Sequence, residues 1–134
     1  MTSPSRLPYE GIRVVEFTHM VMGPTCGMVL ADLGAEVIKV EPIGQGHEGD
    51  STRQLIGSGA GFFPLFNRNK KSLALDLQTP EGKEAALRLI ATADIVTENF
   101  KSGTMKKLGF DYETLKKLNP QLIYVSLKGF LPGP

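Results

Sequence analysis

Three kinds of recognition chemistry lie close together between residues 99 and 107. Asn99 offers an amide, Phe100 offers an aromatic face, and Lys101, Lys106 and Lys107 supply positive charge. A ligand that combines a purine with phosphates would use these properties together. A solvated basic surface has the same composition, and the spacing alone favours that simpler interpretation.

Two other segments contain residue types that are often functional. His19 precedes Gly23-Pro24, where a helix N-terminus could meet an anion, although a histidine bonded to a loop carbonyl is the more common case. Glycines 44, 46 and 49 form a G-x-G-x-x-G series after an apolar segment. In dinucleotide-binding proteins a helix opens within this motif, but the residues from Asp50 to Arg53 are not an apolar-periodic helix start. We therefore expect a loop here and no dinucleotide site.

Composition excludes several classes of protein and site. The 134 residues include 15 Lys+Arg and 14 Asp+Glu, so the basic excess typical of a nucleic-acid binder is missing. The single cysteine, Cys26, excludes an internal disulfide framework and a cysteine-rich zinc site, and we expect no metal. No apolar run approaches the roughly 18 residues of a membrane span, and the N-terminus has no apolar signal segment. We therefore expect a cytoplasmic protein without a membrane partner.

Strand-like and helix-like segments alternate along the chain. Apolar, β-branched or alternating patterns predict strands over residues 12–17, 36–40, 71–77, 94–97 and 122–127. Helices are predicted from Pro24 to Leu33 and from Pro80 behind an N-capping Thr79. Two shorter helices are also predicted, one that ends at Gly109 and one that Asp111 caps and that ends before Pro120. The fold class is therefore α/β, a Rossmann-like and largely parallel sheet with flanking helices.

The expected sheet selects the loops in which a ligand could bind. In an open parallel sheet, ligands bind beyond the carboxyl ends of the strands. That rule points to residues 18–23, 41–49, 98–104 and 128–134, and residues 41–60 as a whole are predicted to be a long glycine-rich loop. Because the chain ends after an apolar strand with no further helix to cover it, we expect an incomplete domain.

Taken in order, these segments resemble the N-terminal part of the class III CoA-transferases, the family that includes formyl-CoA transferase, carnitine CoA-transferase and α-methylacyl-CoA racemase. The matching stretches are residues 11–18, 23–24, 30–41, 67–72, 75–76, 79–82, 98–100, 108–109 and 118–120. Residues 1–10 are then predicted to be a loose leader. Residues 11–134 are predicted to be the N-terminal part of the large Rossmann-like domain.

The resemblance implies an enzyme that moves CoA from an acyl-CoA to a carboxylic acid. Its nucleophile would be an aspartate, which forms an anhydride and then an enzyme-bound thioester. The family places that aspartate beyond Pro134, so no catalytic residue is assigned within the chain and the chain alone is expected to be inactive. CoA and acyl-CoA are substrates here, with no permanently bound cofactor, and the resemblance implies an interlocked homodimer for a full-length form.

The resemblance also implies which residues approach CoA. They are Val21, Met22, Leu75, Asp76, Leu77, Gln78, Asn99, Phe100, Lys101 and Lys107. Pro42 stands where the family has a basic residue, so one phosphate or adenine contact is expected to be lost or supplied elsewhere. Purely structural roles remain open, with Leu75 in the core and Lys107 on the surface. Two other functions also remain open: an acyl-CoA racemase or isomerase of the same fold, and a non-catalytic domain that binds CoA or a nucleotide.

Overall fold

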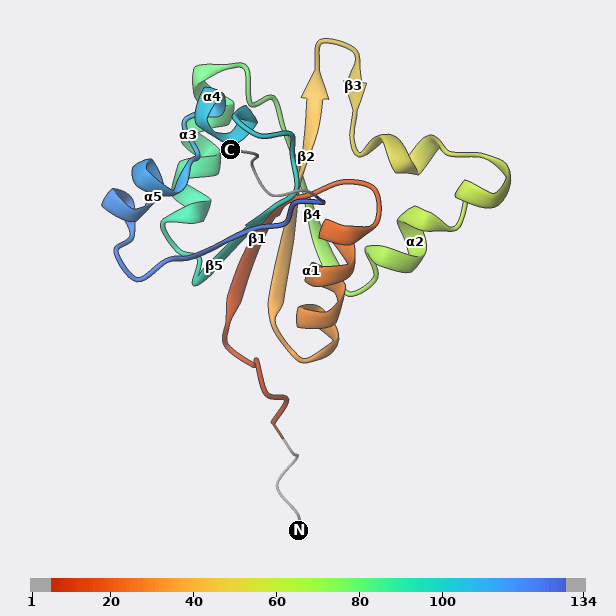
Figure 1. Cartoon of the computed structure of the whole chain (residues 1–134), viewed down its shortest axis with the longest axis horizontal. Coiled ribbons are helices and arrows are strands. Elements are labelled where there is room, and N and C mark those ends of the chain that lie inside the picture. Colours follow the sequence, from red (N-terminus) through yellow and green to blue (C-terminus); the bar gives the residue numbers. More distant parts are fainter. Residues whose placement is uncertain (1–5, 130–134) are drawn as a thin grey trace.

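The predicted alternation of strands and helices is present in the computed structural model, which describes residues 6–129 (Figure 1). The strands are β1 (Arg13–Phe17), β2 (Glu36–Gly44), β3 (His47–Glu48), β4 (Lys70–Leu75), β5 (Ile95–Glu98) and β6 (Ile123–Ser126). The α-helices are α1 (Met22–Asp32), α2 (Phe62–Phe66), α3 (Pro80–Ile90), α4 (Thr104–Leu108) and α5 (Tyr112–Leu118). Two 3₁₀ helices, η1 (Ser51–Gln54) and η2 (Gly57–Gly59), lie between β3 and α2.

The sheet has the connectivity of a Rossmann-like fold. Strands β4, β2, β1, β5 and β6 are neighbours in that order and all pair in parallel, while β3 pairs antiparallel with the end of β2. The chain adds strands on one side of β1 and then crosses to add β5 and β6 on the other side. A ligand site is therefore favoured at the carboxyl ends of β1 and β5, where the strand order reverses.

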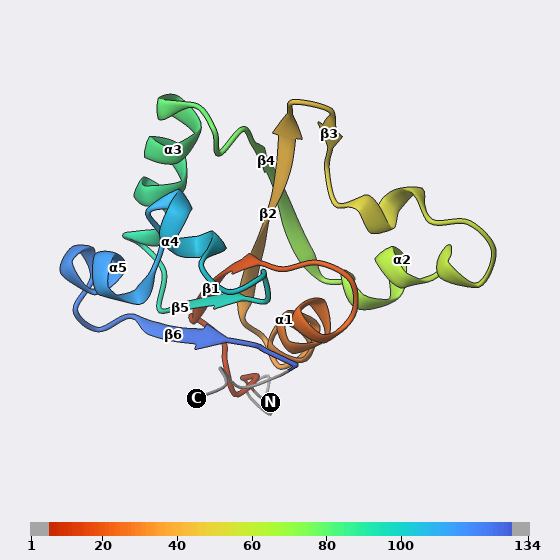
Figure 2. The ribbon, with the colours of Figure 1, turned by 45° about the horizontal axis from the view of Figure 1, so that its top comes forward.

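Helices cover both faces of the sheet (Figure 2). On one face, Val15 and Phe17 of β1 pack with Ile90 of α3, Leu115 of α5 and Phe110 in a continuous apolar core. On the other face, α1 packs against a smaller apolar cluster, whose buried residues are Val14, Ala31, Ala35 and Val37. The central strands β1 and β5 are therefore buried on both faces, whereas the outer strands β4 and β6 stay partly exposed.

The predicted terminus signals of α3, α4 and α5 are confirmed. The Thr79 side chain accepts a hydrogen bond from the Gly82 N–H at the start of α3, where Pro80 is the first helical residue. The Asp111 side chain caps α5 in the same way, and Gly109 ends α4 with a φ of +82°. These local rules fixed the helix positions because each cap satisfies a backbone group at a helix end that lacks a partner within the helix.

The long loop predicted over residues 41–60 is wrong in its first part. Strand β2 continues to Gly44 and turns back through Gln45 and Gly46, whose φ angles are +49° and +85°, into β3. Two central residues with positive φ are typical of a type I′ hairpin turn, in which glycine is favoured. Asp50 then caps η1, and no α-helix opens at the glycine series, in keeping with our interpretation of it as a loop.

Two further differences concern helices. Helix α1 begins at Met22, so Pro24 is its third residue and not its first. Helix α2 was not predicted at all, because five residues are too few to show a helical period. Residues 8–11 form a turn, which the Tyr9 N–H ties to the end of α1 by donating to the Leu33 carbonyl. Residues 1–5 of the predicted leader and residues 130–134 lie outside the described part. Between residues 6 and 129, no helix combines the length and the apolar character needed to cross a bilayer.

Candidate functional site

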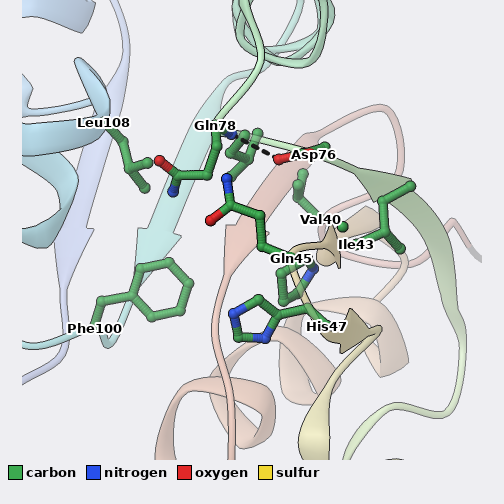
Figure 3. Close-up of a pocket in the computed structure, with 11 residues that line it drawn as sticks. Val40, Ile43, Gln45, His47, Asp76, Gln78, Phe100 and Leu108 are labelled. Atoms are coloured by element: carbon green, nitrogen blue, oxygen red, sulfur yellow. Dashed lines mark hydrogen bonds between the residues drawn. The ribbon is translucent and has the colours of Figure 1, made fainter.

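A cavity of about 130 Å³ lies at the carboxyl edge of the sheet (Figure 3). Three segments form it: the β2–β3 hairpin, the turn from β4 to α3, and the loop from β5 to α4. The lining residues are Val40, Pro42, Ile43, Gly44, Gln45, His47, Asp76, Leu77, Gln78, Phe100 and Leu108. We call it the hairpin cavity. Its walls are largely apolar, and the amides of Gln45 and Gln78 and the rings of His47 and Phe100 gather around it.

The turn between β4 and α3 is held by Asp76. Its carboxylate accepts the Gln78 N–H at 2.9 Å, and its carbonyl accepts the Thr79 hydroxyl at 2.8 Å. The same carboxylate lies against Gly44, where an added Cβ would come within 2.4 Å of the Asp76 Oδ2. The hairpin can therefore pack onto the turn only because residue 44 is glycine. Asp76, Leu77 and Gln78 line the cavity as a result, whereas Leu75 packs against the apolar core.

The loop after β5 is tied to the loop after β1. Asn99 Oδ1 accepts the His19 N–H at 2.9 Å, and Asn99 Nδ2 donates to the His19 carbonyl at 2.9 Å. The Phe100 ring packs against the His19 imidazole with 5.5 Å between centroids. The Asn99 amide, predicted to be free for a ligand, is thus engaged by main chain. Its role is to join the two loops where the strand order reverses.

The remaining predicted residues lie around this edge at different depths. Met22, Asn99, Phe100 and Lys101 line one shallow depression, so the structure brings the first and third predicted loops together. Val21 is exposed beside Met22 at the start of α1. Lys107 is exposed on α4 and is not part of the lining of the hairpin cavity.

Sequence reasoning missed a buried ionic cluster on the α1 side of the sheet. Glu16, Lys39 and Lys70 come from the three adjacent strands β1, β2 and β4. The Lys70 Nζ donates to Glu16 Oε1 at 2.8 Å and to the Pro24 carbonyl at 2.8 Å, and the Lys39 Nζ lies 3.7 Å from the same Glu16 oxygen. Gly27 makes room for this carboxylate, because an added Cβ would stand 1.9 Å from Glu16 Oε2.

The cluster continues toward the carboxyl edge. Lys39 Nζ lies 2.9 Å from Asp50 Oδ2 and donates to the Thr18 carbonyl at 2.6 Å. Glu41 accepts two hydrogen bonds from Arg53, both at 2.7 Å. Burial by itself would raise the pKa of Glu41, but hydrogen bonds from Arg53, from Ser72 and from the Asp50 N–H outweigh it and lower the pKa to about 2. Glu41 is therefore a carboxylate at neutral pH, and the cluster as a whole contains three acidic and three basic side chains: Glu16, Glu41 and Asp50 with Lys39, Lys70 and Arg53.

A signal for this cluster is visible in the sequence. Glu16 interrupts the apolar run from Val14 to Phe17, and Lys39 interrupts the run from Val37 to Val40. Charged residues are rarely fully buried unless they are paired. Glu16 and Lys39 are register partners on β1 and β2, a pairing that only the strand order reveals.

A second cavity, of about 180 Å³, lies beneath the loop after β1. It shares Val40, Pro42, His47 and Phe100 with the hairpin cavity. Its other lining residues are Thr18, His19, Lys39, Glu41, Gly49, Asp50 and Ser51. We call it the Thr18 cavity. Although histidines and carboxylates line it, no group of three or more potential metal ligands occurs among the residues described.

Comparisons with known proteins agree on one family. The sequence profile of CoA-transferase family III matches residues 9–134. The chain is 44% identical over 129 residues to formyl-CoA:oxalate CoA-transferase of Afipia carboxidovorans, covering 93% of this chain and 30% of that protein. It is 41% identical over 140 residues to an acyl-CoA transferase of Fusarium pseudograminearum, and this match covers 96% of this chain and 30% of that protein. The chain thus spans about 30% of the length of these curated relatives.

Solved structures show the same relationship. Rv3272 from Mycobacterium tuberculosis is 47% identical to this chain and superposes on it with a TM-score of 0.87. The superposition covers 98% of this chain and 36% of the Rv3272 chain. A CAIB/BAIF family protein from Brucella suis is 46% identical, with a TM-score of 0.86 over 97% of this chain and 36% of its own. The α/β fold described here is therefore the N-terminal portion of a larger fold in these proteins.

Proposed function

The chain belongs to CoA-transferase family III, and from this premise we propose that its hairpin cavity binds the nucleotide end of CoA or an acyl-CoA. The observation that carries the proposal is a juxtaposition. Asp76–Gln78 and Phe100, which the resemblance associates with CoA, come from distant parts of the sequence and line one cavity at the carboxyl edge of the sheet.

The chemistry of the cavity suits an adenine. Phe100 offers an aromatic face, and Val40, Ile43 and Leu108 supply apolar walls. The amides of Gln45 and Gln78 can donate to and accept from the edge of a base. Lys101 and Lys107, both exposed near this edge, are the residues that we expect to meet phosphates.

As part of a longer enzyme, the chain would serve CoA transfer between an acyl-CoA and a carboxylic acid. An aspartate carboxylate attacks the thioester carbonyl, the CoA thiolate leaves, and a mixed anhydride forms. The thiolate then attacks the aspartyl carbonyl, which releases the donor acid and leaves an aspartyl-CoA thioester for the acceptor acid. We assign this aspartate to the region beyond residue 134, and the interlocked homodimer belongs to the same proposal.

The test is a calorimetric titration of the chain with CoA, with 3′,5′-ADP as a probe for the nucleotide part alone. Saturable binding of both is expected. Phe100→Leu should weaken both about three- to tenfold through loss of the aromatic face. Phe62→Leu, which alters a half-buried phenylalanine of α2 outside this cavity, is the matched control.

A second pair of variants tests the phosphate contact. Lys107→Glu should weaken CoA binding about tenfold or more, because an attractive charge becomes repulsive. Lys117→Glu makes the same charge change on an exposed lysine of α5. If both variants weaken CoA binding equally, the effect comes from overall charge and not from a contact at Lys107. If Lys107→Glu binds CoA as tightly as the unaltered chain, Lys107 is not part of the site. Absence of CoA binding to the unaltered chain would contradict the proposal.

A further inference from the structure

The His47 side chain is exposed and lines the hairpin cavity. Among residues 6–129 its ring makes no hydrogen bond, no ion pair and no contact with another aromatic ring. No motif in the sequence singles out this histidine, because only the β2–β3 hairpin brings it to the carboxyl edge of the sheet. The imidazole is therefore available to a ligand.

The hairpin fixes where this ring lies. His47 is the first residue of β3 and the register partner of Gly44 across the turn through Gln45 and Gly46. Gly44 in turn packs against the Asp76 carboxylate, and the Gly49 N–H donates to the Pro42 carbonyl at 2.8 Å. Backbone pairing and the contact of Gly44 with Asp76 thus position His47 at the cavity without any bond to its own side chain.

Phe100 reaches the same space from the loop after β5. Figure 3 shows the His47 and Phe100 rings pointing toward one another across the hairpin cavity. Both residues also line the Thr18 cavity, so the two rings lie where the cavities adjoin. The Phe100 ring is itself held in place, because it packs against His19 with 5.5 Å between centroids. The cavity therefore has an aromatic ring on each of two sides, one from the hairpin and one from the β5–α4 loop.

The lining defines the chemistry of the occupant. Val40, Pro42 and Ile43 surround the two rings with apolar surface. The lining contains no lysine or arginine, and the Asp76 carboxylate would repel a phosphate group. A flat aromatic base suits this space, because each of its two faces can stack on an aromatic side chain.

We infer that His47 and Phe100 form an aromatic clamp, in which the adenine of the bound nucleotide stacks between the two rings. The inference rests on the proposed function and deepens it, because it assigns a specificity-determining role to His47, a residue outside the predicted CoA-binding set. The face of the imidazole makes the contact, and its nitrogens are not required. The phosphates then lie outside the clamp, on the side of the exposed lysines.

Two variants of His47 separate stacking from hydrogen bonding. His47→Phe keeps an aromatic face and removes both nitrogens, whereas His47→Gln keeps a hydrogen-bonding side chain and removes the ring. The full chain and its variants are titrated with 3′,5′-ADP. Affinity should fall about fivefold or more in His47→Gln and stay within about twofold of the unaltered chain in His47→Phe. The melting temperature should change in neither variant, because the ring has no contact to lose within residues 6–129.

Proton NMR of the ligand reports the stacking itself. The adenine H2 and H8 resonances of 3′,5′-ADP should move upfield on binding to the unaltered chain and to His47→Phe, and less in His47→Gln. Glu48→Gln is the matched control, since it places the same glutamine one residue further along β3. Successive side chains of a strand point to opposite faces, and Glu48 is exposed and not part of the lining of the hairpin cavity. Its affinity and its ligand shifts should equal those of the unaltered chain.

The remaining outcomes separate failure of the clamp from failure of the proposed function. Unchanged affinity in His47→Gln, or equal weakening in His47→Gln and Glu48→Gln, would overturn the clamp and leave the proposed function standing. Equal weakening in His47→Phe and His47→Gln would show that the imidazole nitrogens make the contact, which also contradicts the clamp. If neither CoA nor 3′,5′-ADP binds the unaltered chain, the proposed function is wrong and the clamp falls with it.

Discussion

The two faces of the sheet bury their residues in different ways. Under α3, α4 and α5, the face that carries Val15 and Phe17 buries the larger apolar cluster, with the ion pair of Glu98 and Lys128 at its carboxyl edge. Under α1, the opposite face is apolar only toward the amino ends of the strands, at Val14 and Val37. Toward the carboxyl ends it carries Glu16, Lys39 and their partners, at 0% and 1% exposure.

The apolar face stabilises the fold, whereas the charged face fixes the geometry of the carboxyl edge. The apolar face gains from removing carbon surface from water, at about 25 cal/mol per Å². The charged face loses hydration for every ion it buries, and a buried ion pair is often no more stable than apolar residues of the same volume. What the charged face provides is fixed geometry at the carboxyl edge, since Lys39 binds the Thr18 carbonyl and Asp50 binds Lys39.

The largest effect is expected from breaking the charged face. Lys39→Met should lower the free energy of unfolding by about 3–5 kcal/mol, because Asp50 and Glu16 lose their shared cation in a dry environment. Denaturation with urea measures it. Lys71→Met is the control, since Lys71 is 69% exposed in its pair with Glu36 and should contribute at most about 1 kcal/mol. Similar losses in both variants would remove the distinction between the two kinds of pair.

A smaller effect is expected from pH, through Glu41 on the charged face. The pKa of Glu41 is about 2 in the folded chain against an ordinary value of 4.5. Its contribution to stability is therefore fully present above pH 4.5 and is lost as pH falls from 4.5 toward 2. Urea midpoints at pH 6, 4 and 3 should decrease in that order, and the decrease should be shallower in Glu41→Gln. An identical pH dependence in the two proteins would contradict the assignment.

The smallest effect is expected from a methyl deletion on the apolar face. Ile90→Val should cost about 0.5–1.5 kcal/mol, because it removes one buried methylene from a fully packed site. Its cost should be the same at pH 6 and pH 4, measured by the same urea titrations, because the group removed carries no charge. A cost that grew on acidification would show that the two faces do not act independently.

Local sequence determined much of the fold. The sequence correctly predicts helix ends at Thr79 with Pro80, at Asp111 and at Gly109. Thr79 and Asp111 accept hydrogen bonds from backbone N–H groups at helix starts, and Gly109 adopts the left-handed conformation that ends α4. Apolar runs located β1 and β5 to within a residue or two because both strands are central in the sheet and buried on both faces. The ordered series of motifs also predicts the family that the profile match shows.

Tertiary structure alone decided the rest. The hairpin at Gln45–Gly46 and helix α2 involve too few residues for a periodic pattern, and they depend on contacts such as Gly44 against Asp76 and Arg53 over Phe63. Asn99 was correctly placed at the edge, but its engagement with His19 spans 80 residues of sequence. The pairing of Glu16 with Lys39 and Lys70 required the strand order, because charges far apart in the chain attract only when the fold makes them neighbours and removes the water between them.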